Sequence, residues 1–352
     1  MPVRPRPGIA AVPPYAQGRP APSGGFKLSS NENPFPPLPS VLDAVSEQVQ
    51  FVNLYPDATA SKLRESLSHE LGVTTDRLLV TDGSVAALAQ LLLAVAETGD
   101  EVVYAWRSFE AYPLLVATTG ATSVQVPLRA DASHDLEAMV AAITPKTRAI
   151  IVCSPNNPTG TLVRQAEWDA FLAAVPDDVL VILDEAYIEF VQDSEAIDGI
   201  VAAEQANVVT VRTFSKAYGL AGLRVGYAIG DAELLHAVRT AGIPLSVTGL
   251  AQAAATASLA AKGELFARVE TLIAERDALR EALLEIGLPV PEAHGNFLWI
   301  PVPPSHRDAV EDVLHSNGIV ARHFPEGVRV SIGEHAASEK IVNSAREIAR
   351  LF

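Results

Sequence analysis

The sequence predicts an α/β fold with a mostly parallel sheet, followed by a smaller α+β domain at the C-terminal end. Short apolar runs of strand length recur between residues 77 and 229, with helix-forming segments between them. Such runs are typical of strands that are buried on both faces of a parallel sheet. Beyond about residue 245 this alternation gives way to long helical segments. A chain of 352 residues is also long enough for about two domains, at roughly 150 residues each.

The first 40 residues contain many prolines and little periodicity, so we expect an extended arm that packs on the small domain and the active site. The predicted large domain covers residues 41–250 and the small domain residues 251–352. In the large domain the strand-like runs lie at residues 77–81, 101–104, 122–126, 148–153, 179–183, 207–211 and 224–229, and helices are predicted at 84–97 and 109–118.

The small domain is predicted to contain four helices and two strands. The helices lie at residues 250–261, 264–286, 305–317 and 338–351, and the strands at 296–300 and 328–332. Ser305 is a candidate N-cap for the third helix, because a serine hydroxyl can accept a hydrogen bond from a free amide of the first turn. Gly287 and Gly318 follow the ends of two helices, as glycines commonly do.

Composition limits the classes of partner. The chain has 42 acidic and 26 Lys or Arg residues and a net charge of −16. An acidic chain repels nucleic-acid phosphates and anionic lipids, so we expect neither nucleic acid nor membrane as a partner. The most apolar run, residues 86–96, has about half the length of a bilayer-spanning helix, and the first residues lack a signal-peptide pattern. With one cysteine, Cys153, no internal disulfide is possible, and we expect a cytoplasmic protein.

Polar segments follow several predicted strands. Ser154–Gly160 follows one buried run, Asp184–Tyr187 follows the next, and Lys216 lies in a loop rich in small residues. Open α/β sheets bind ligands at the carboxyl ends of their strands. Each segment also has an ordinary interpretation: Asn, Pro and Gly favour turns, and most lysines are solvated. Asp184 could equally cap a helix, bind a metal or form an ion pair.

Lys216 is the candidate for covalent chemistry. Its small and apolar neighbours favour a lowered pKa and Schiff-base formation. Ser215 and Arg224 would then bind an anion, and the helix that begins at Gly83–Ser84 offers free amides and a positive dipole end to a phosphate. The motifs of dinucleotide sites, P-loops and zinc proteases are absent from the sequence, and we predict no metal site.

The order of these residues favours one kind of cofactor. Asn157, Asp184, Tyr187, Lys216 and Arg224 follow one another along the chain. An aldehyde cofactor with a phosphate, a phenolic oxygen and a ring nitrogen requires such a set. Lys216 would bind the aldehyde and Asp184 would keep the ring nitrogen protonated. Asn157 and Tyr187 would donate hydrogen bonds to the phenolic oxygen.

In these residues the chain resembles the fold-type I pyridoxal-phosphate aminotransferases and, within them, the histidinol-phosphate aminotransferase group. The resemblance runs from about residue 15 to the C-terminus. The matching segments are Leu28–Pro34, Asn53–Asp57, Ser154–Gly160, Asp184–Tyr187, Ser215–Lys216 with Arg224, and Arg329–Gly333. The resemblance implies pyridoxal 5′-phosphate as cofactor, a large domain with a mostly parallel seven-stranded sheet, a small C-terminal domain and a homodimer.

The resemblance also assigns roles outside these loops. It implies that Tyr55 reaches the cofactor phosphate of the neighbouring subunit and that Phe109 stacks on the pyridine ring. Arg329 matches the arginine that binds the substrate carboxylate or an equivalent phosphate. Tyr15 and the arm are expected to close the substrate pocket. Arg322 would either be part of the cationic region that binds a substrate phosphate in relatives or be an ordinary surface residue.

Two departures bear on the substrate. Gly83–Ala86 reads Gly-Ser-Val-Ala, where many histidinol-phosphate enzymes have Gly-Ser/Ala-Asp-Glu, and Phe109 stands where tyrosine is usual. Both features resemble the aromatic amino acid (phenylalanine) aminotransferase branch. We therefore expect a ping-pong transfer of an amino group between aromatic L-amino acids and 2-oxo acids such as phenylpyruvate. The alternatives are a histidinol-phosphate aminotransferase, a pyridoxal-phosphate decarboxylase or lyase, and a binding protein on the same frame.

Overall fold

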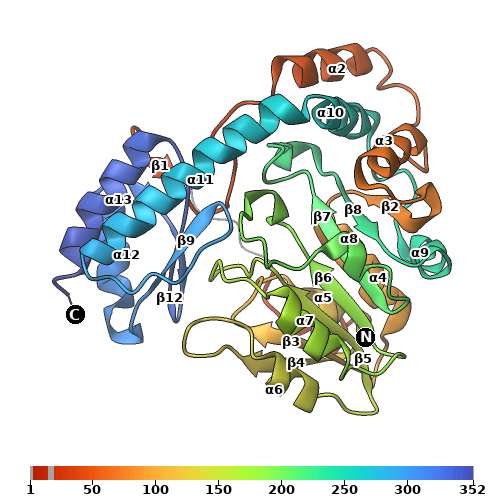
Figure 1. Ribbon diagram of the computed structural model, residues 1–352, viewed down its shortest axis with the longest axis horizontal. Coiled ribbons are helices and arrows are strands. Elements are labelled where there is room, and N and C mark those ends of the chain that lie inside the picture. The colour runs from red at the N-terminus through yellow and green to blue at the C-terminus, as the bar shows by residue number, and fades with distance from the viewer. Residues whose placement is uncertain (1–2, 15–19, 352) are drawn as a thin grey trace.

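The computed structural model describes residues 3–14 and 20–351 (Figure 1). Within these residues, seven strands form a central sheet in the order β2, β8, β7, β6, β5, β3, β4. Their bounds are β2 Leu78–Thr81, β3 Glu101–Trp106, β4 Thr122–Pro127, β5 Thr147–Cys153, β6 Leu180–Asp184, β7 Val208–Thr213 and β8 Gly226–Ile229. β8 is antiparallel to both of its neighbours, whereas the pairs among β3 to β7 are parallel. The predicted mostly parallel seven-stranded sheet is confirmed.

Both faces of the central sheet are buried, which explains why its strands are continuously apolar. Alternate residues of a strand point to opposite faces. Tyr104 and Ile151 pack into one hydrophobic cluster, and their neighbours Val103 and Ile150 pack into another. The helices on the first face are α4 Ser84–Val95, α5 Tyr112–Thr119 and α9 Ala232–Val238, and those on the second are α6 Leu136–Ala141, α7 Gln165–Leu172 and α8 Gly199–Ala202.

A second group of elements, coloured blue in Figure 1, surrounds a small antiparallel sheet. Among the described residues this sheet has three strands, in the order β11 Arg322–Phe324, β12 Gly327–Ser331, β9 Phe297–Pro301. The helices packed with it are α11 Lys262–Glu285, α12 Arg307–Ser316 and α13 His335–Ile348. Leu298, Val328 and Val330 join the core cluster that these helices share. Because side chains alternate along a strand, Trp299 and Arg329 lie on the opposite face of the small sheet.

Two further helices pair beside the central sheet, at the top of Figure 1. α2 Pro39–Val49 packs against α10 Gly249–Ala260, and α3 Ser61–Leu71 also contacts α10. The predicted boundary between residues 250 and 251 lies within α10. Among residues 3–14 and 20–351, no helix combines the length and the apolar character that crossing a bilayer requires.

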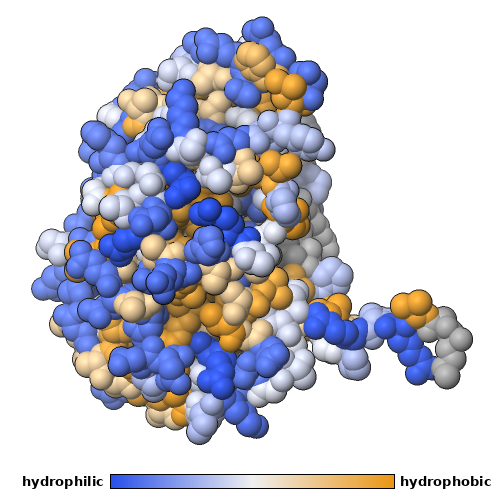
Figure 2. All heavy atoms as spheres, turned by 90° about the vertical axis from the view of Figure 1, so that its right-hand side faces the viewer, coloured by the Kyte–Doolittle hydropathy of each residue, from blue (hydrophilic) through white to orange (hydrophobic). Residues whose placement is uncertain are grey.

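The second half of the arm packs alongside the small sheet. β1 Phe26–Lys27 pairs in parallel with β10 Ile319–Val320, and Leu28 accepts a hydrogen bond from the amide of Ser331 at 2.9 Å. Nearer the start of the chain, α1 Pro7–Ala10 buries no residue but contacts α5, and Nη2 of Arg6 donates to the backbone oxygen of Thr118 at 2.6 Å. Figure 2 shows a thin extension from the body of the molecule. Tyr15 lies outside the described residues.

Three predicted helix starts are wrong, those of α5, α12 and α13, of which α13 begins at His335 instead of 338. α5 begins at Tyr112 instead of 109 and has a proline in its first turn, where the missing amide hydrogen costs no helical hydrogen bond. This leaves Phe109 in the loop that follows β3. α12 begins at Arg307 after a 3₁₀ turn, so Ser305 is not its N-cap. The Ser305 hydroxyl instead lies 3.1 Å from Nδ1 of His306.

Candidate active site

A cavity lies at the carboxyl ends of β5, β6 and β7 and reaches the small sheet. Nine of the residues predicted from the sequence line it: Ser84, Phe109, Asn157, Asp184, Tyr187, Ser215, Lys216, Arg224 and Arg329. Asn157, Asp184 and Lys216 meet there because parallel strands end at the same edge of a sheet, and each of these residues stands at or just beyond the end of β5, β6 or β7. Ser30 and Asn31 of the arm complete the wall.

Lys216 is partly buried in the loop after β7. Its ammonium nitrogen Nζ donates to the backbone oxygen of Ser30 at 3.1 Å. Asn33 fixes the loop, because its amide nitrogen donates to the backbone oxygens of Lys216 and Ala217 at 3.2 and 2.9 Å. Burial, aided by the positive charge of Arg329, lowers the pKa of Lys216 to about 7. A large fraction of this amine is therefore neutral near pH 7 and can act as a nucleophile or a base.

Asp184 ends β6 and is buried. Its Oδ2 accepts a hydrogen bond from the Tyr112 hydroxyl at 2.7 Å, and its Oδ1 accepts one from the amide of Ala186 at 3.2 Å. Burial raises the pKa of Asp184 to about 6, against these hydrogen bonds and the charge of Lys216. A carboxylate in such a place is stabilised by a cation, and a protonated ring nitrogen would supply one. Tyr112 was not predicted as a site residue, and no spacing rule connects it to Asp184.

A hydrogen-bonded group connects the cavity to the small sheet and the arm. The Tyr187 hydroxyl accepts from the side-chain amide of Asn31 at 3.0 Å. Burial raises the pKa of Tyr187, so the phenol keeps its proton and can donate it to a ligand. Arg329 donates to Oδ1 of Asn157 and to the backbone oxygen of Ser29. The remaining group of Asn157, its NH₂, is a donor. Asn31 was also missed as a site residue, although its segment carried the family resemblance.

Ser215, Arg224 and the start of α4 form a group of anion-binding donors. Nη1 of Arg224 lies 3.4 Å from Oγ of Ser215. Gly83 has a φ of +106°, and a Cβ at this position would lie 2.5 Å from Nη2 of Arg224. A side chain here would therefore fill the space between the helix start and the guanidinium. A guanidinium, a hydroxyl and free helix amides fit a phosphate group.

Phe109 and Cys153 add neutral walls to the cavity. The Phe109 ring packs edge-on against Tyr112, with their centroids 5.6 Å apart. Burial raises the pKa of the Cys153 thiol to about 12, so it stays protonated and is a poor nucleophile. Phe109 can therefore offer its ring to a flat ligand, while Cys153 contributes packing and no reactive thiolate.

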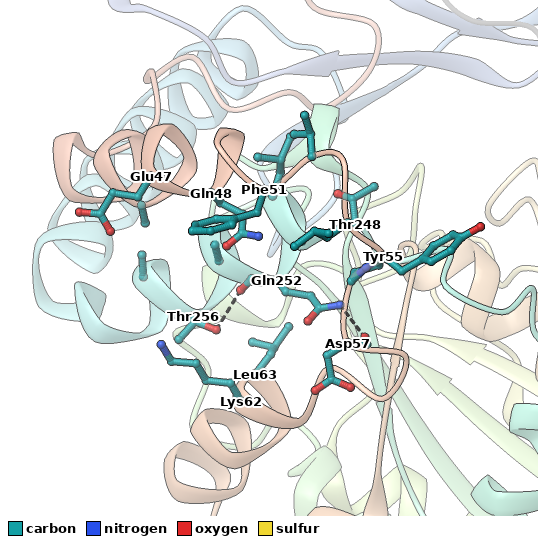
Figure 3. Close-up of a pocket in the computed structure, with 18 of the residues that line it drawn as sticks. Glu47, Gln48, Phe51, Tyr55, Asp57, Lys62, Leu63, Thr248, Gln252 and Thr256 are labelled. Atoms are coloured by element: carbon teal, nitrogen blue, oxygen red, sulfur yellow. Dashed lines mark hydrogen bonds between the residues drawn. The ribbon is translucent and has the colours of Figure 1, made fainter.

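Three other described residues that were predicted for the site do not line this cavity: Gly83, which directly precedes Ser84, and Tyr55 and Arg322. Tyr55 is 87% exposed and lines a separate groove (Figure 3). Arg322 lies on β11 directly opposite Arg329 on β12, and its Nε donates to Oε2 of Glu110 at 2.8 Å.

Comparison with known proteins agrees with this geometry. Residues 23–344 match the family Aminotransferase class I and II. The chain is a class I/II aminotransferase. It is 50% identical to the aromatic amino acid aminotransferase of Streptomyces avermitilis over 336 residues, which cover 94% of this chain and 93% of that protein. It is 49% identical to the protein of the same name from Thermobifida fusca over 346 residues, 97% of this chain and 96% of the relative.

A solved structure supports the same assignment. The aminotransferase superposes on the histidinol-phosphate aminotransferase of Sinorhizobium meliloti in complex with pyridoxal 5′-phosphate with a TM-score of 0.91, at 25% identity and over 100% and 99% of the two chains. The predictions of family, fold, transaminase activity and pyridoxal 5′-phosphate are confirmed. When bound, this cofactor supplies an aldehyde and a pyridine ring that accepts electrons from the substrate α-carbon.

Proposed function

We propose that this aminotransferase moves an amino group between aromatic L-amino acids and 2-oxo acids such as phenylpyruvate. The proposal rests on relatives of about half-identical sequence that carry the name aromatic amino acid aminotransferase. The site is compatible with it, because the guanidinium of Arg329 lies among rings, 5.6 Å from the centroid of Phe297 and 6.0 Å from that of Phe324. An aromatic side chain beside such rings would gain both burial and ring contacts.

Cofactor binding is proposed to use the residues at the ends of the central strands. Asp184 would face the ring nitrogen, and Asn157 and Tyr187 would donate to the phenolic oxygen. The phosphate would be held by the donors described above: Ser215, Arg224 and the helix start at Gly83–Ser84. Phe109 would cover the ring. The buried carboxylate of Asp184, the hydrogen-bond donors and the ring of Phe109 support these assignments.

The substrate is proposed to bind between Arg329 and Lys216. A planar guanidinium matches a carboxylate through two parallel hydrogen bonds, so Arg329 would hold the substrate α-carboxylate. The neutral amine of Lys216, which the low pKa favours, would take the proton from the substrate α-carbon.

We also propose that the protein is a homodimer and that it works in the cytoplasm. The connection after α2 exposes Phe51, Val52, Leu54 and Tyr55, and the adjoining groove of about 880 Å³ is bounded by α2 and α10. Patches of this kind mark interfaces between proteins. In Figure 3 the Tyr55 hydroxyl points away from this groove. A second copy that covers the patch would receive the Tyr55 phenol at its own cofactor phosphate.

Paired kinetics test the proposed substrate. Values of kcat/KM are measured on one preparation with phenylpyruvate and with histidinol phosphate, each with its amino-group partner. We expect phenylpyruvate to be preferred. A higher kcat/KM for histidinol phosphate would replace the aromatic function with the alternative one. Release of carbon dioxide or ammonia from phenylalanine, without amino exchange, would instead indicate a decarboxylase or a lyase.

A further inference from the structure

Two ion pairs join the loop after β3 to the small sheet beside the cavity. Nη2 of Arg107 lies 2.9 Å from Oε1 of Glu326, and Nε of Arg322 lies 2.8 Å from Oε2 of Glu110. The pairs have opposite polarity, since the loop contributes the cation of one and the anion of the other. Phe109, which lines the cavity, stands between their loop residues. Both ion pairs therefore adjoin the loop that contributes Phe109 to the cavity wall.

Arg322 and Arg329 are direct neighbours across strands. The antiparallel register of β11 and β12 pairs them, so their side chains leave the same face of the small sheet. Phe324 lies on this face as well, with its ring centroid 5.5 Å from that of Trp299. Two adjacent guanidinium groups form a site for a dianion such as a phosphate ester. The fold thus places a second cation next to the one proposed to bind the carboxylate.

Glu110 changes what this pair of arginines can bind. The side chains of Arg322 and Glu110 are only 18% and 29% exposed, so their interaction is screened less than a surface pair would be. The partners of Arg329 described above are neutral oxygens of Asn157 and Ser29, whereas Arg322 faces a carboxylate. A dianion that recruited Arg322 would share its guanidinium with Glu110 and meet the negative charge of that carboxylate.

We propose that Glu110 is a specificity-determining residue, which holds Arg322 in an ion pair and so adapts the carboxylate end of the site to one negative charge instead of two. This inference rests on the proposed function and explains how it rejects phosphate esters. Like-charge repulsion against the wrong ligand is an effective source of discrimination. The residue binds no substrate itself and acts through Arg322.

The test compares Glu110→Gln with Glu326→Gln. Both substitutions remove one negative charge and one ion pair from the same loop–sheet contact, but only the first removes the carboxylate that faces Arg322. Two ligands that cannot be turned over serve as probes: 3-phenylpropionate, a monoanion, and 2-phenylethyl phosphate, which is close to a dianion at pH 8. Their Kd values are measured by calorimetry on the holoenzyme at low ionic strength.

We expect Glu110→Gln to raise affinity for 2-phenylethyl phosphate about tenfold, as one charged hydrogen bond becomes available, and to change that for 3-phenylpropionate less than about twofold. Glu326→Gln should leave the ratio of the two Kd values at its wild-type level. Adding Arg322→Gln to Glu110→Gln should abolish the gain. Glu110→Ala provides the same comparison if the glutamine variant folds poorly.

The inference would be overturned if the ratio of the two Kd values did not change in Glu110→Gln, or if it changed equally in Glu326→Gln. The ion pair between Arg322 and Glu110 would then serve only to connect the loop to the small sheet. Failure of the proposed function has a different signature. In that case the unsubstituted enzyme would prefer histidinol phosphate to phenylpyruvate in the paired kinetics, whatever Glu110→Gln does to the two probes.

Discussion

The cavity at the strand ends and the groove beside Tyr55 are opposites in chemistry. The cavity buries ionisable groups, and burial moves two pKa values toward 7: it lowers the pKa of Lys216 and raises that of Asp184. The groove does the reverse, because it exposes apolar side chains such as Val52, which is 67% accessible. Both arrangements are unfavourable for an isolated chain. Buried charge indicates a site for chemistry, while exposed apolar surface indicates a partner. The following predictions test this distinction.

Replacing Lys216 should have the largest effect. Lys216→Ala removes both the amine that binds the cofactor aldehyde and the base at the substrate α-carbon, so turnover should fall at least about 1,000-fold. Steady-state rates with phenylalanine measure the loss, and absorbance measures the cofactor retained without a covalent bond. Lys262→Ala, which removes a lysine paired with Glu70 outside the cavity, should retain nearly normal rates. Nearly normal turnover in Lys216→Ala would remove Lys216 from the chemistry.

Asp184 should matter far more to rate than to folding. Asp184→Ala should lower kcat about 100-fold or more, because the charge that faces the cofactor ring is lost. The free energy of unfolding should fall only by about 1 kcal/mol through the lost Tyr112 hydrogen bond.

The matched control for Asp184 is Tyr112→Phe. It removes the same hydrogen bond but keeps the carboxylate, so it should reproduce the loss of stability without most of the loss of rate. Chemical denaturation and kinetics on both variants separate the two effects. Equal losses of rate in the two variants would make Asp184 a structural residue.

Arg329 tests the side of the cavity that the small sheet provides. Arg329→Leu should weaken phenylpyruvate binding by roughly 1.5–3 kcal/mol, the usual contribution of a hydrogen bond to a charged group. Calorimetric Kd values measure it. Arg346→Leu on α13 removes an arginine that contacts Asn343 outside the cavity and should leave the Kd unchanged. Equal affinities of the Arg329 variant and the wild type would exclude carboxylate binding by Arg329.

Tyr55 tests the groove. A 1:1 mixture of Tyr55→Ala and Lys216→Ala subunits should recover about a quarter of the wild-type activity, because half of the dimers are hybrids and each hybrid has one intact site. Assays before and after subunit exchange measure the recovery, and sedimentation measures the mass. Unmixed samples of each variant provide the baseline. A fully active monomer would mean that the cavity is complete within one chain.

The smallest expected effect is on stability. The folded pKa of Lys216, about 7, lies below the ordinary value of 10.5 for a lysine, so the folded protein binds fewer protons between these pH values. The wild type therefore gains stability as pH rises from about 7 toward 10.5. Lys216→Met should stabilise the cofactor-free protein by more than about 1 kcal/mol at pH 7, and this advantage should shrink at higher pH. Urea unfolding at pH 7 and at about pH 9.5 measures it. A stability advantage of Lys216→Met that is the same at both pH values would contradict the lowered pKa of Lys216.

Much of the site follows from local sequence. Continuous apolar runs indicate strands of a doubly covered parallel sheet, and such strands end at one edge. Asn157, Asp184 and Lys216 each stand just beyond such a run, so their meeting could be predicted without coordinates. The glycine turn before α4 could also be recognised, because helix starts have a fixed chemistry.

Only the tertiary structure determined the contacts between elements that are distant in sequence. Tyr112 reaches Asp184 across 72 positions, and Arg322 reaches Glu110 across 212. The arm brings Asn31 to Tyr187 across 156 positions. Periodicity predicts which face of an element is buried, but it does not specify which side chain of another element will lie opposite. Which side chains meet depends on how separate helices, loops and sheets pack together. These contacts decide which charged side chains near the substrate site have an oppositely charged partner.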